Sequence, residues 1–158
     1  MTHPGEHWLE LKVPPPLVAL VAALAMWGFT FLAPFIPSPP AWRIYVALAL
    51  ALVGGAFDLA GLLSMRRART TILPWQPEKT QALVQSGVYR LTRNPMYVGL
   101  LWELVALATY LFSPWALLGP LAFFGYISRF QIKPEERVLR ELFGPEYRAY
   151  QARVRRWL

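Results

Sequence analysis

The chain has 158 residues, of which 56% are hydrophobic and only 16% are charged, and its net charge is +7. In soluble globular domains, about a quarter of the residues are charged, so this composition indicates a membrane protein. The sequence has no cysteine, which excludes disulfides, cysteine-ligated metals and thiolate catalysis. The two histidines, His3 and His7, lie on an N-terminal tail, so we expect no metal site and no histidine base.

Four apolar runs approach the roughly 20 residues that a membrane-spanning helix needs. The first is 17–36, and prolines precede and follow it. Its apolar core is too long for a cleaved signal peptide, and a second span soon follows. The second run is about 44–65 and is interrupted only by Asp58.

A very short turn joins the third and fourth runs. The third run is 96–112 and carries Glu103, and the fourth is 115–132. Because only Ser113-Pro114 separates them, the two helices must form an antiparallel hairpin. We therefore expect an all-α polytopic membrane protein with about four transmembrane helices, in a single domain over 1–158.

Basic residues are concentrated on one side of the predicted membrane, and the other side has only Arg43. By the positive-inside rule, both termini and the central loop are cytoplasmic, and we expect the chain in the cell (inner) membrane. This bias and the attraction to anionic lipid account for most of the net charge, so nucleic-acid binding is not needed to explain it. The cytoplasmic basic residues are Arg66, Arg67, Arg69, Lys79, Arg90, Arg93, Lys133, Arg137, Arg140, Arg148, Arg153, Arg155 and Arg156.

The tail 133–158 is expected to form short helices at the cytoplasmic interface. Pro134 suits a first helical turn, and the carboxylates of Glu135 and Glu136 favour the helix dipole there. Gly144-Pro145 should end this helix. A second short helix is expected in the headgroup region, with arginines on one side and an aromatic side that is formed by Tyr147, Tyr150, Val154 and Trp157.

A polar cluster precedes the third span. Asn94 is a good N-cap and Pro95 a good first helical residue, so free backbone N–H groups should face the cytoplasm and bind an anion. Arg90 and Arg93 add positive charge. Tyr89 and Tyr97 offer aromatic faces to a cation and hydroxyls for hydrogen bonds. With the two glutamates after the fourth span, this describes a site for an amino-acid-like ligand. The alternative is an interfacial anchor of tyrosine and arginine on a well-capped helix.

Two motifs lie some 35 residues apart: LVxxGVYRxxRNPMYxG at 83–99 and PEExxLxxxFGxxYxxY at 134–150. Together they resemble the isoprenylcysteine carboxyl methyltransferase family, whose relatives include the phospholipid N-methyltransferases. The resemblance covers roughly 70–156, and upstream only the presence of apolar spans matches. It implies that S-adenosylmethionine binds at the cytoplasmic side, between the start of the third span and the Glu-Glu segment. The implied cofactor contacts are Gln81, Ala82, Leu83, Val84, Tyr89, Asn94, Pro95, Met96, Tyr97 and Glu135.

The chain departs from this family at two positions. Members that methylate prenylcysteine have histidine where this chain has Asn94, and they have arginine where this chain has Gln131. In the family, that arginine is linked to the carboxylate of the substrate. The departure therefore argues against prenylcysteine as the acceptor.

The chemistry itself needs few special residues. Methyl transfer from a sulfonium requires alignment and exclusion of water, so no metal or nucleophilic side chain is expected and no residue is assigned a catalytic role. A carboxylate acceptor needs no base, whereas an ammonium must first lose a proton to a nearby carboxylate.

Two intramembrane acids bear on that choice. Asp58 and Glu103 lie at matching depth, about 12 Å inside the cytoplasmic ends of their helices, beside small residues that suit helix packing. Acids inside a membrane are candidates for function, and we expect these two, with Arg129 and Gln131, on the substrate side. The alternative is an interhelical hydrogen bond, either with one proton shared between the two acids or with Arg129 as a counter-ion.

These observations predict methyl transfer from S-adenosylmethionine to a membrane-embedded lipophilic acceptor at the cytoplasmic side. The acceptor is a carboxylate or an amine, and phospholipid amines are among the candidates. One alternative is an NADPH-dependent membrane reductase, because the sterol reductases have a related C-terminal helical region. Another is a non-enzymatic membrane assembly protein that uses the same hairpin to hold a partner.

Overall fold

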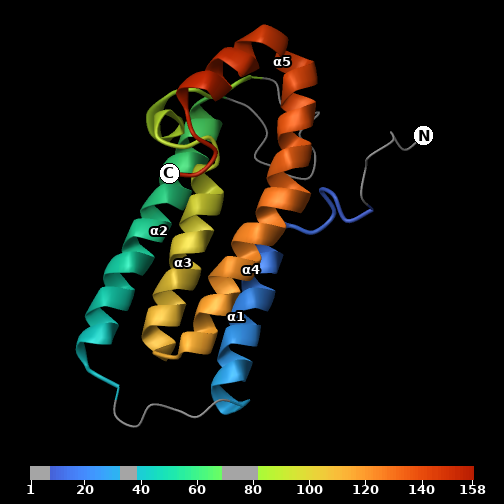
Figure 1. Cartoon of the computed structure of the whole chain (residues 1–158). Coiled ribbons are helices and arrows are strands. Elements are labelled where there is room, and N and C mark those ends of the chain that lie inside the picture. The colour runs from blue at the N-terminus through green and yellow to red at the C-terminus, as the bar shows by residue number, and fades with distance from the viewer. Residues whose placement is uncertain (1–7, 33–38, 69–81) are drawn as a thin grey trace.

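The computed structural model of the protein describes residues 8–32, 39–68 and 82–158, which form helices and turns without strands (Figure 1). The predicted all-α class is confirmed. Gln81 and the end of the first predicted span, 33–36, lie outside the described residues. The elements are α1 (Pro15–Leu32), α2 (Trp42–Arg67), η2 (Gly87–Arg90), α3 (Pro95–Leu111), η3 (Pro114–Leu117), α4 (Leu118–Tyr126), η4 (Ile127–Ile132) and α5 (Lys133–Arg153).

The helices form two neighbouring pairs. α2 packs along α3, and α1 packs against both α3 and α4, while α5 bends over one end of the molecule (Figure 1). Phe112 ends α3 in the left-handed region with φ 50°, and extended Ser113 leads into η3. The predicted antiparallel hairpin of the third and fourth runs is therefore confirmed.

One described helix, α2, is both long and apolar enough to cross a membrane. Its 26 residues extend about 39 Å, more than the roughly 30 Å of a hydrocarbon core. α1 and α3 are apolar but have 18 and 17 residues, slightly fewer than the roughly 20 residues of a typical span. The structure thus shows one candidate span, and the count of four belongs to the proposal below.

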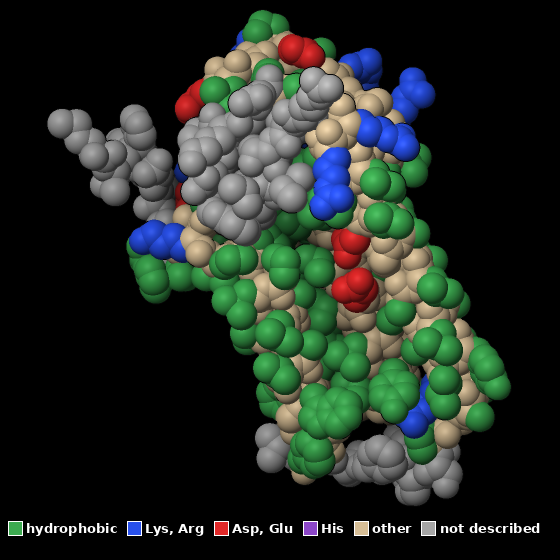
Figure 2. Space-filling view, turned by 180° about the vertical axis from the view of Figure 1, so that it is seen from behind, with side chains coloured by type: hydrophobic (Ala, Val, Ile, Leu, Met, Phe, Trp, Pro, Cys, Tyr) green, Lys and Arg blue, Asp and Glu red, His purple; other side chains and the backbone are tan. Residues whose placement is uncertain are grey.

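Large apolar side chains cover the outside of the molecule. Leu24 on α1, Leu52 on α2 and Leu121 on α4 have exposed fractions of 64%, 74% and 66%. Figure 2 shows one such face, with hydrophobic side chains over most of its surface and basic side chains gathered towards one end. Exposed apolar surface of this extent is typical of contact with lipid or with a partner protein.

Glycines allow α2 and α3 to approach closely. A Cβ atom on Gly54 would lie 2.8 Å from the carbonyl oxygen of Gly99, and one on Gly61 would lie 2.8 Å from Cγ of Met96. A Cβ atom on Gly99 would overlap the carboxylate of Asp58. The predicted packing role of these small residues is confirmed, and the backbones meet because no side chain separates them.

We expect Gly99→Ala to destabilise the protein by about 1–3 kcal/mol, since the added methyl group must displace Asp58 or separate α2 from α3. Gly55→Ala is a matched control on α2, because a Cβ atom there has no neighbour within 4 Å. Thermal unfolding of both variants in one detergent measures the effect. Equal melting temperatures for the two variants would contradict the close packing at Gly99.

η3, α4, η4 and α5 form one continuous helical run from Pro114 to a sharp kink at Gly144, where φ is 48°. The predicted stop at Gly144-Pro145 is this kink, beyond which the chain stays helical to Arg153. The part of α5 beyond the kink was predicted to contact the headgroup region through its aromatic residues. This prediction is wrong for Tyr147 and Tyr150. Both are buried against the rest of the protein, because the kink turns this part of α5 back over the other helices.

Candidate functional site

The start of α3 and the start of α5 meet at a cluster of three side chains, in which Tyr97 and Gln131 are buried and Glu135 is half-buried. The hydroxyl of Tyr97 donates to Oε1 of Glu135 at 2.6 Å, and Nε2 of Gln131 donates to the same oxygen at 2.7 Å. Gln131 lies in the wider π-helical turn of η4, a type of turn that is frequent at functional sites. We call these three residues the Glu135 cluster. It joins the two sequence motifs, which are far apart along the chain.

Glu135 is held in surroundings that oppose its charge. Burial raises its pKa from the usual 4.5 to about 7, and the neighbouring charge of Glu136 acts in the same direction. The hydrogen bonds from Tyr97 and Gln131 favour the charged form, but they offset burial only in part. Glu135 can therefore change its protonation state near neutral pH.

The raised pKa of Glu135 predicts a pH-dependent stability. Between its unfolded pKa of 4.5 and its folded pKa of about 7, the folded protein binds the extra proton. This contribution is complete below pH 4.5 and is lost as the pH rises through 7. We expect the melting temperature of the wild type, relative to Glu135→Gln, to fall as the pH is raised from about 5 to 8. A pH-independent difference between the two proteins would contradict the raised pKa.

The next residue, Glu136, is fixed by two arginines. Its Oε1 accepts from Arg93 at 2.9 Å, and its Oε2 accepts from Arg156 at 2.7 Å. Glu136 is 3% exposed and the side chain of Arg93 is 10% exposed, so their ion pair is largely shielded from water, whereas Arg156 is more exposed. Glu136 therefore holds the C-terminal segment against the residues that precede α3.

α3 begins at Pro95 as predicted, but Asn94 does not cap it with its side chain. The side-chain amide of Asn94 donates instead to the carbonyl oxygen of Arg156 at 2.8 Å, and the hydroxyl of Thr92 donates to the same oxygen at 3.1 Å. The backbone N–H of Arg93 donates to the carbonyl oxygen of Arg155 at 2.9 Å. The expected cap is replaced by these contacts because the C-terminal segment lies across this end of the helix.

The segment that precedes α3 lies along the part of α5 beyond the kink. The hydroxyl of Tyr150 donates to the carbonyl oxygen of Tyr89 at 2.7 Å, and Arg153 donates to the side chain of Gln85 at 2.9 Å. Val84 and Tyr89 are buried, and burial raises the pKa of the Tyr89 hydroxyl above its usual range. Of the other implied cofactor contacts, Ala82 and Leu83 are half-buried in this segment, and Pro95 and Met96 form the first turn of α3.

The four residues predicted for the substrate side do not form one group. Asp58 faces Gly99 across the α2–α3 contact, and Glu103 is exposed one turn further along α3. The alternative in which Arg129 is the counter-ion of the intramembrane acids is wrong, because Arg129 forms an ion pair with Glu10 at 2.8 Å. Gln131 belongs to the Glu135 cluster instead. No spacing pattern indicated Glu10, which comes from a segment of the chain far from Arg129.

A family model described as phospholipid methyltransferase matches residues 42–146. The chain belongs to the phospholipid methyltransferase family. The matched range includes Asp58 and all of the Glu135 cluster. It excludes α1 and the C-terminal segment around Arg156.

Three relatives illustrate the similarity. A probable protein-S-isoprenylcysteine O-methyltransferase of Oryza sativa subsp. indica is 33% identical over 113 residues, which are 70% of this chain and 58% of the relative. The protein-S-isoprenylcysteine O-methyltransferase of Xenopus laevis is 29% identical over 138 residues, 85% of this chain and 48% of the relative. A Haemophilus influenzae protein, described as uncharacterized, is 46% identical over 63 residues, 40% of this chain and its own full length. The chain thus spans about half the length of these two methyltransferases.

Proposed function

We propose that the protein transfers a methyl group from S-adenosylmethionine to a lipophilic acceptor in the membrane, at the cytoplasmic face. The observation that carries this proposal is the Glu135 cluster. In it, Tyr97 from the start of α3 donates to Glu135 from the start of α5, within the part of the chain that matches the phospholipid methyltransferase family. A non-catalytic anchor does not require a half-buried carboxylate with a pKa near 7 at this point.

The side chains around the cluster have the chemistry that S-adenosylmethionine needs. This cofactor has hydroxyl groups and an ammonium, which a carboxylate such as Glu135 binds, and a carboxylate, which a guanidinium binds. Nε of Arg93 is buried and has no hydrogen-bond partner among the described residues, so an anionic group of a ligand would satisfy it. We propose that Glu135, Tyr97 and Arg93 hold the cofactor, together with the buried segment around Val84 and Tyr89.

The exposed apolar surface supports a chain that crosses the membrane about four times. Along α2, only 17% of the most apolar 18-residue window is buried inside the protein, so this helix is not the core helix of a soluble domain. We propose that α1, α3 and the run from η3 to η4 are the other spans. Arg66 lies at the end of α2, Arg93 just before α3 and Arg137 in α5, at the end of the molecule where α5 bends (Figure 1). By the positive-inside rule, this end would lie on the cytoplasmic side of the cell membrane.

The residues of the chain would contribute by binding the cofactor and by excluding water from the reacting atoms. When bound, the cofactor supplies a methyl group on a sulfonium, which a correctly placed acceptor atom takes by in-line displacement. Tyr97 and Glu135 would fix the orientation of the donor, and the apolar helices would exclude water from the reacting atoms.

Calorimetric titration of the purified protein tests the proposal with S-adenosylhomocysteine, S-adenosylmethionine and NADPH. We expect the first two to bind in a saturable way and NADPH not to bind. Binding of NADPH alone would support a reductase instead, and an absence of binding for all three would support an assembly protein. Either outcome overturns the methyltransferase proposal.

A further inference from the structure

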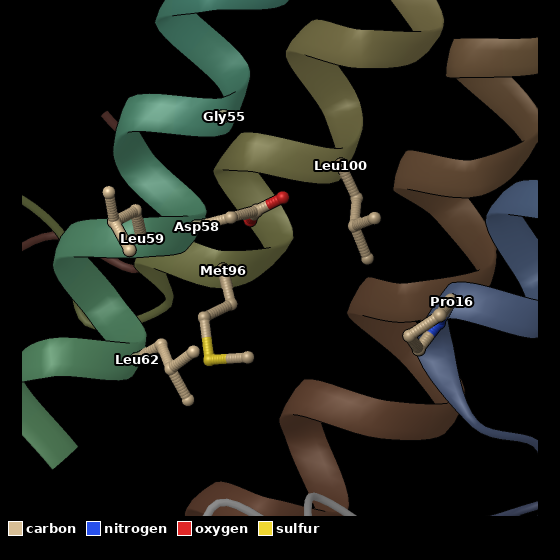
Figure 3. Close-up of a pocket in the computed structure, with 7 residues that line it drawn as sticks. All are labelled: Pro16, Gly55, Asp58, Leu59, Leu62, Met96 and Leu100. Carbon is tan, nitrogen blue, oxygen red and sulfur yellow. The ribbon is translucent and has the colours of Figure 1, made fainter. Parts of the chain in front are cut away.

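A pocket of about 390 Å³ lies between α2, α3 and the start of α1 (Figure 3). This volume is in the range of small-molecule sites. Its lining is apolar apart from one carboxylate. The lining side chains include Pro16, Asp58, Leu59, Leu62, Met96 and Leu100.

Asp58 has no partner for its charge among the described residues. Its Oδ1 atom is buried and makes no hydrogen bond, and the carboxylate lies against Gly99 at the α2–α3 contact. Asp58 as a whole is half-buried, but a buried carboxylate oxygen without a partner is still costly, so the site favours a ligand that neutralises it. Glu103 is the nearest charged neighbour and is also acidic. Any ligand that enters this pocket thus meets negative charge.

The pocket lies beside the proposed cofactor site. Met96 lines the pocket, and Tyr97, the next residue of α3, donates to Glu135. A group bound at Asp58 and a donor bound at the Glu135 cluster would therefore share the first turn of α3. None of the described lining residues is cationic, so nothing in the pocket would pair with a carboxylate acceptor.

We propose that the methyl acceptor is a lipophilic amine, and that Asp58 binds its ammonium in this pocket. The inference rests on the function proposed above and selects the amine over the carboxylate. Asp58 accepts a proton from the ammonium, which leaves a neutral amine with a free electron pair. The nitrogen then forms its bond to the methyl carbon while the bond from that carbon to sulfur breaks, and sulfur keeps the electron pair as a thioether. One proton is released to solvent from Asp58 for each methyl group transferred.

Chemical labelling tests the binding step without turnover. A hydrophobic carbodiimide couples to carboxyl groups in apolar surroundings, and peptide mass spectrometry locates the adduct. With wild-type protein in nanodiscs, we expect dodecyltrimethylammonium to slow labelling of Asp58 by about tenfold, because its positive charge is attracted to the carboxylate at the edge of an apolar pocket. Dodecanoate, which has the same chain length, should not slow it. Equal protection by both probes, or protection by dodecanoate alone, overturns the assignment.

A methylation assay then distinguishes a free lipophilic amine from the headgroup amine of a phospholipid. Dodecylamine in phosphatidylcholine nanodiscs and phosphatidylethanolamine in the bilayer itself are the two test acceptors, with dodecanoic acid as the third. We expect methylation of at least one amine, and we expect Asp58→Asn to lower it by about tenfold or more while the affinity for S-adenosylhomocysteine is unchanged. Glu141→Gln, at an exposed position on α5, is the control for loss of one negative charge.

Failure of the inference and failure of the proposed function give different results. Methylation of dodecanoic acid alone, with normal binding of S-adenosylhomocysteine, overturns the amine assignment and leaves the methyltransferase proposal intact. Loss of S-adenosylhomocysteine binding in the wild type removes both. If Asp58→Asn does not fold, the labelling of the wild-type protein still decides the binding step.

Discussion

Glu135→Ala is expected to weaken the binding of S-adenosylhomocysteine at least tenfold. A hydrogen bond to a charged group is worth about 1.5–3 kcal/mol, and the substitution removes the carboxylate that both Tyr97 and Gln131 contact. The loss should appear as a higher dissociation constant in calorimetry on the purified protein. Melting curves of the same preparation show whether the variant is folded.

Two further variants distinguish a loss of cofactor contacts at the Glu135 cluster from a general loss of folding or of surface charge. Tyr97→Phe removes only the hydroxyl that donates to Glu135, so we expect a smaller loss of affinity in the same direction. Glu141→Ala removes an exposed carboxylate from the same helix and should bind as the wild type does. Wild-type affinity in both Glu135→Ala and Tyr97→Phe would remove the cofactor site from this position.

The sequence predicted those features that depend on residues close to each other in the chain. Pro95 starts α3 because proline fixes the first helical φ angle and needs no amide partner there. Ser113-Pro114 forces a tight hairpin, and Gly144 kinks α5 because it adopts a positive φ without strain. Each of these signals acts within a few residues, so a single sequence is enough to detect it.

The sequence did not predict the contacts that the C-terminal segment makes. Arg156 reaches Glu136, and its carbonyl oxygen accepts from Thr92 and Asn94. No periodicity links residues so far apart, and the arginines of the tail equally suited the membrane surface. Asn94 illustrates the consequence, since a residue that suits an N-cap by its position bonds to the tail instead.

The two adjacent glutamates show the same limit within a single motif. Sequence alone treats Glu135 and Glu136 as equivalent carboxylates at a helix start. Among the described residues, Glu136 contacts two arginines, whereas Glu135 accepts hydrogen bonds from the neutral groups of Tyr97 and Gln131. The difference arises from which helix and tail pack against each residue. Burial without a charged partner among the described residues raises the pKa of Glu135 towards neutrality, and this residue is suited to bind a ligand.

Glu136→Ala is expected to be the most destabilising of these substitutions, at about 3–5 kcal/mol. Removal of one partner from a buried ion pair leaves an uncompensated charge, and the side chain of Arg93 is only 10% exposed. The substitution also releases Arg156, and with it the contacts that hold the C-terminal segment over the start of α3. Equilibrium unfolding in mixed detergent micelles measures the change in free energy.

Arg156→Ala provides the matched comparison, because it removes the more exposed partner, whose side chain is 35% exposed. We expect it to cost clearly less than Glu136→Ala, since Arg93 still neutralises the glutamate. In the double variant, the effect of Arg156→Ala should largely disappear, because its partner is already gone. If Glu136→Ala instead unfolds at the same detergent concentration as the wild type, the ion pairs do not hold the C-terminal segment. The order of the three variants thus distinguishes a buried structural carboxylate from a surface one.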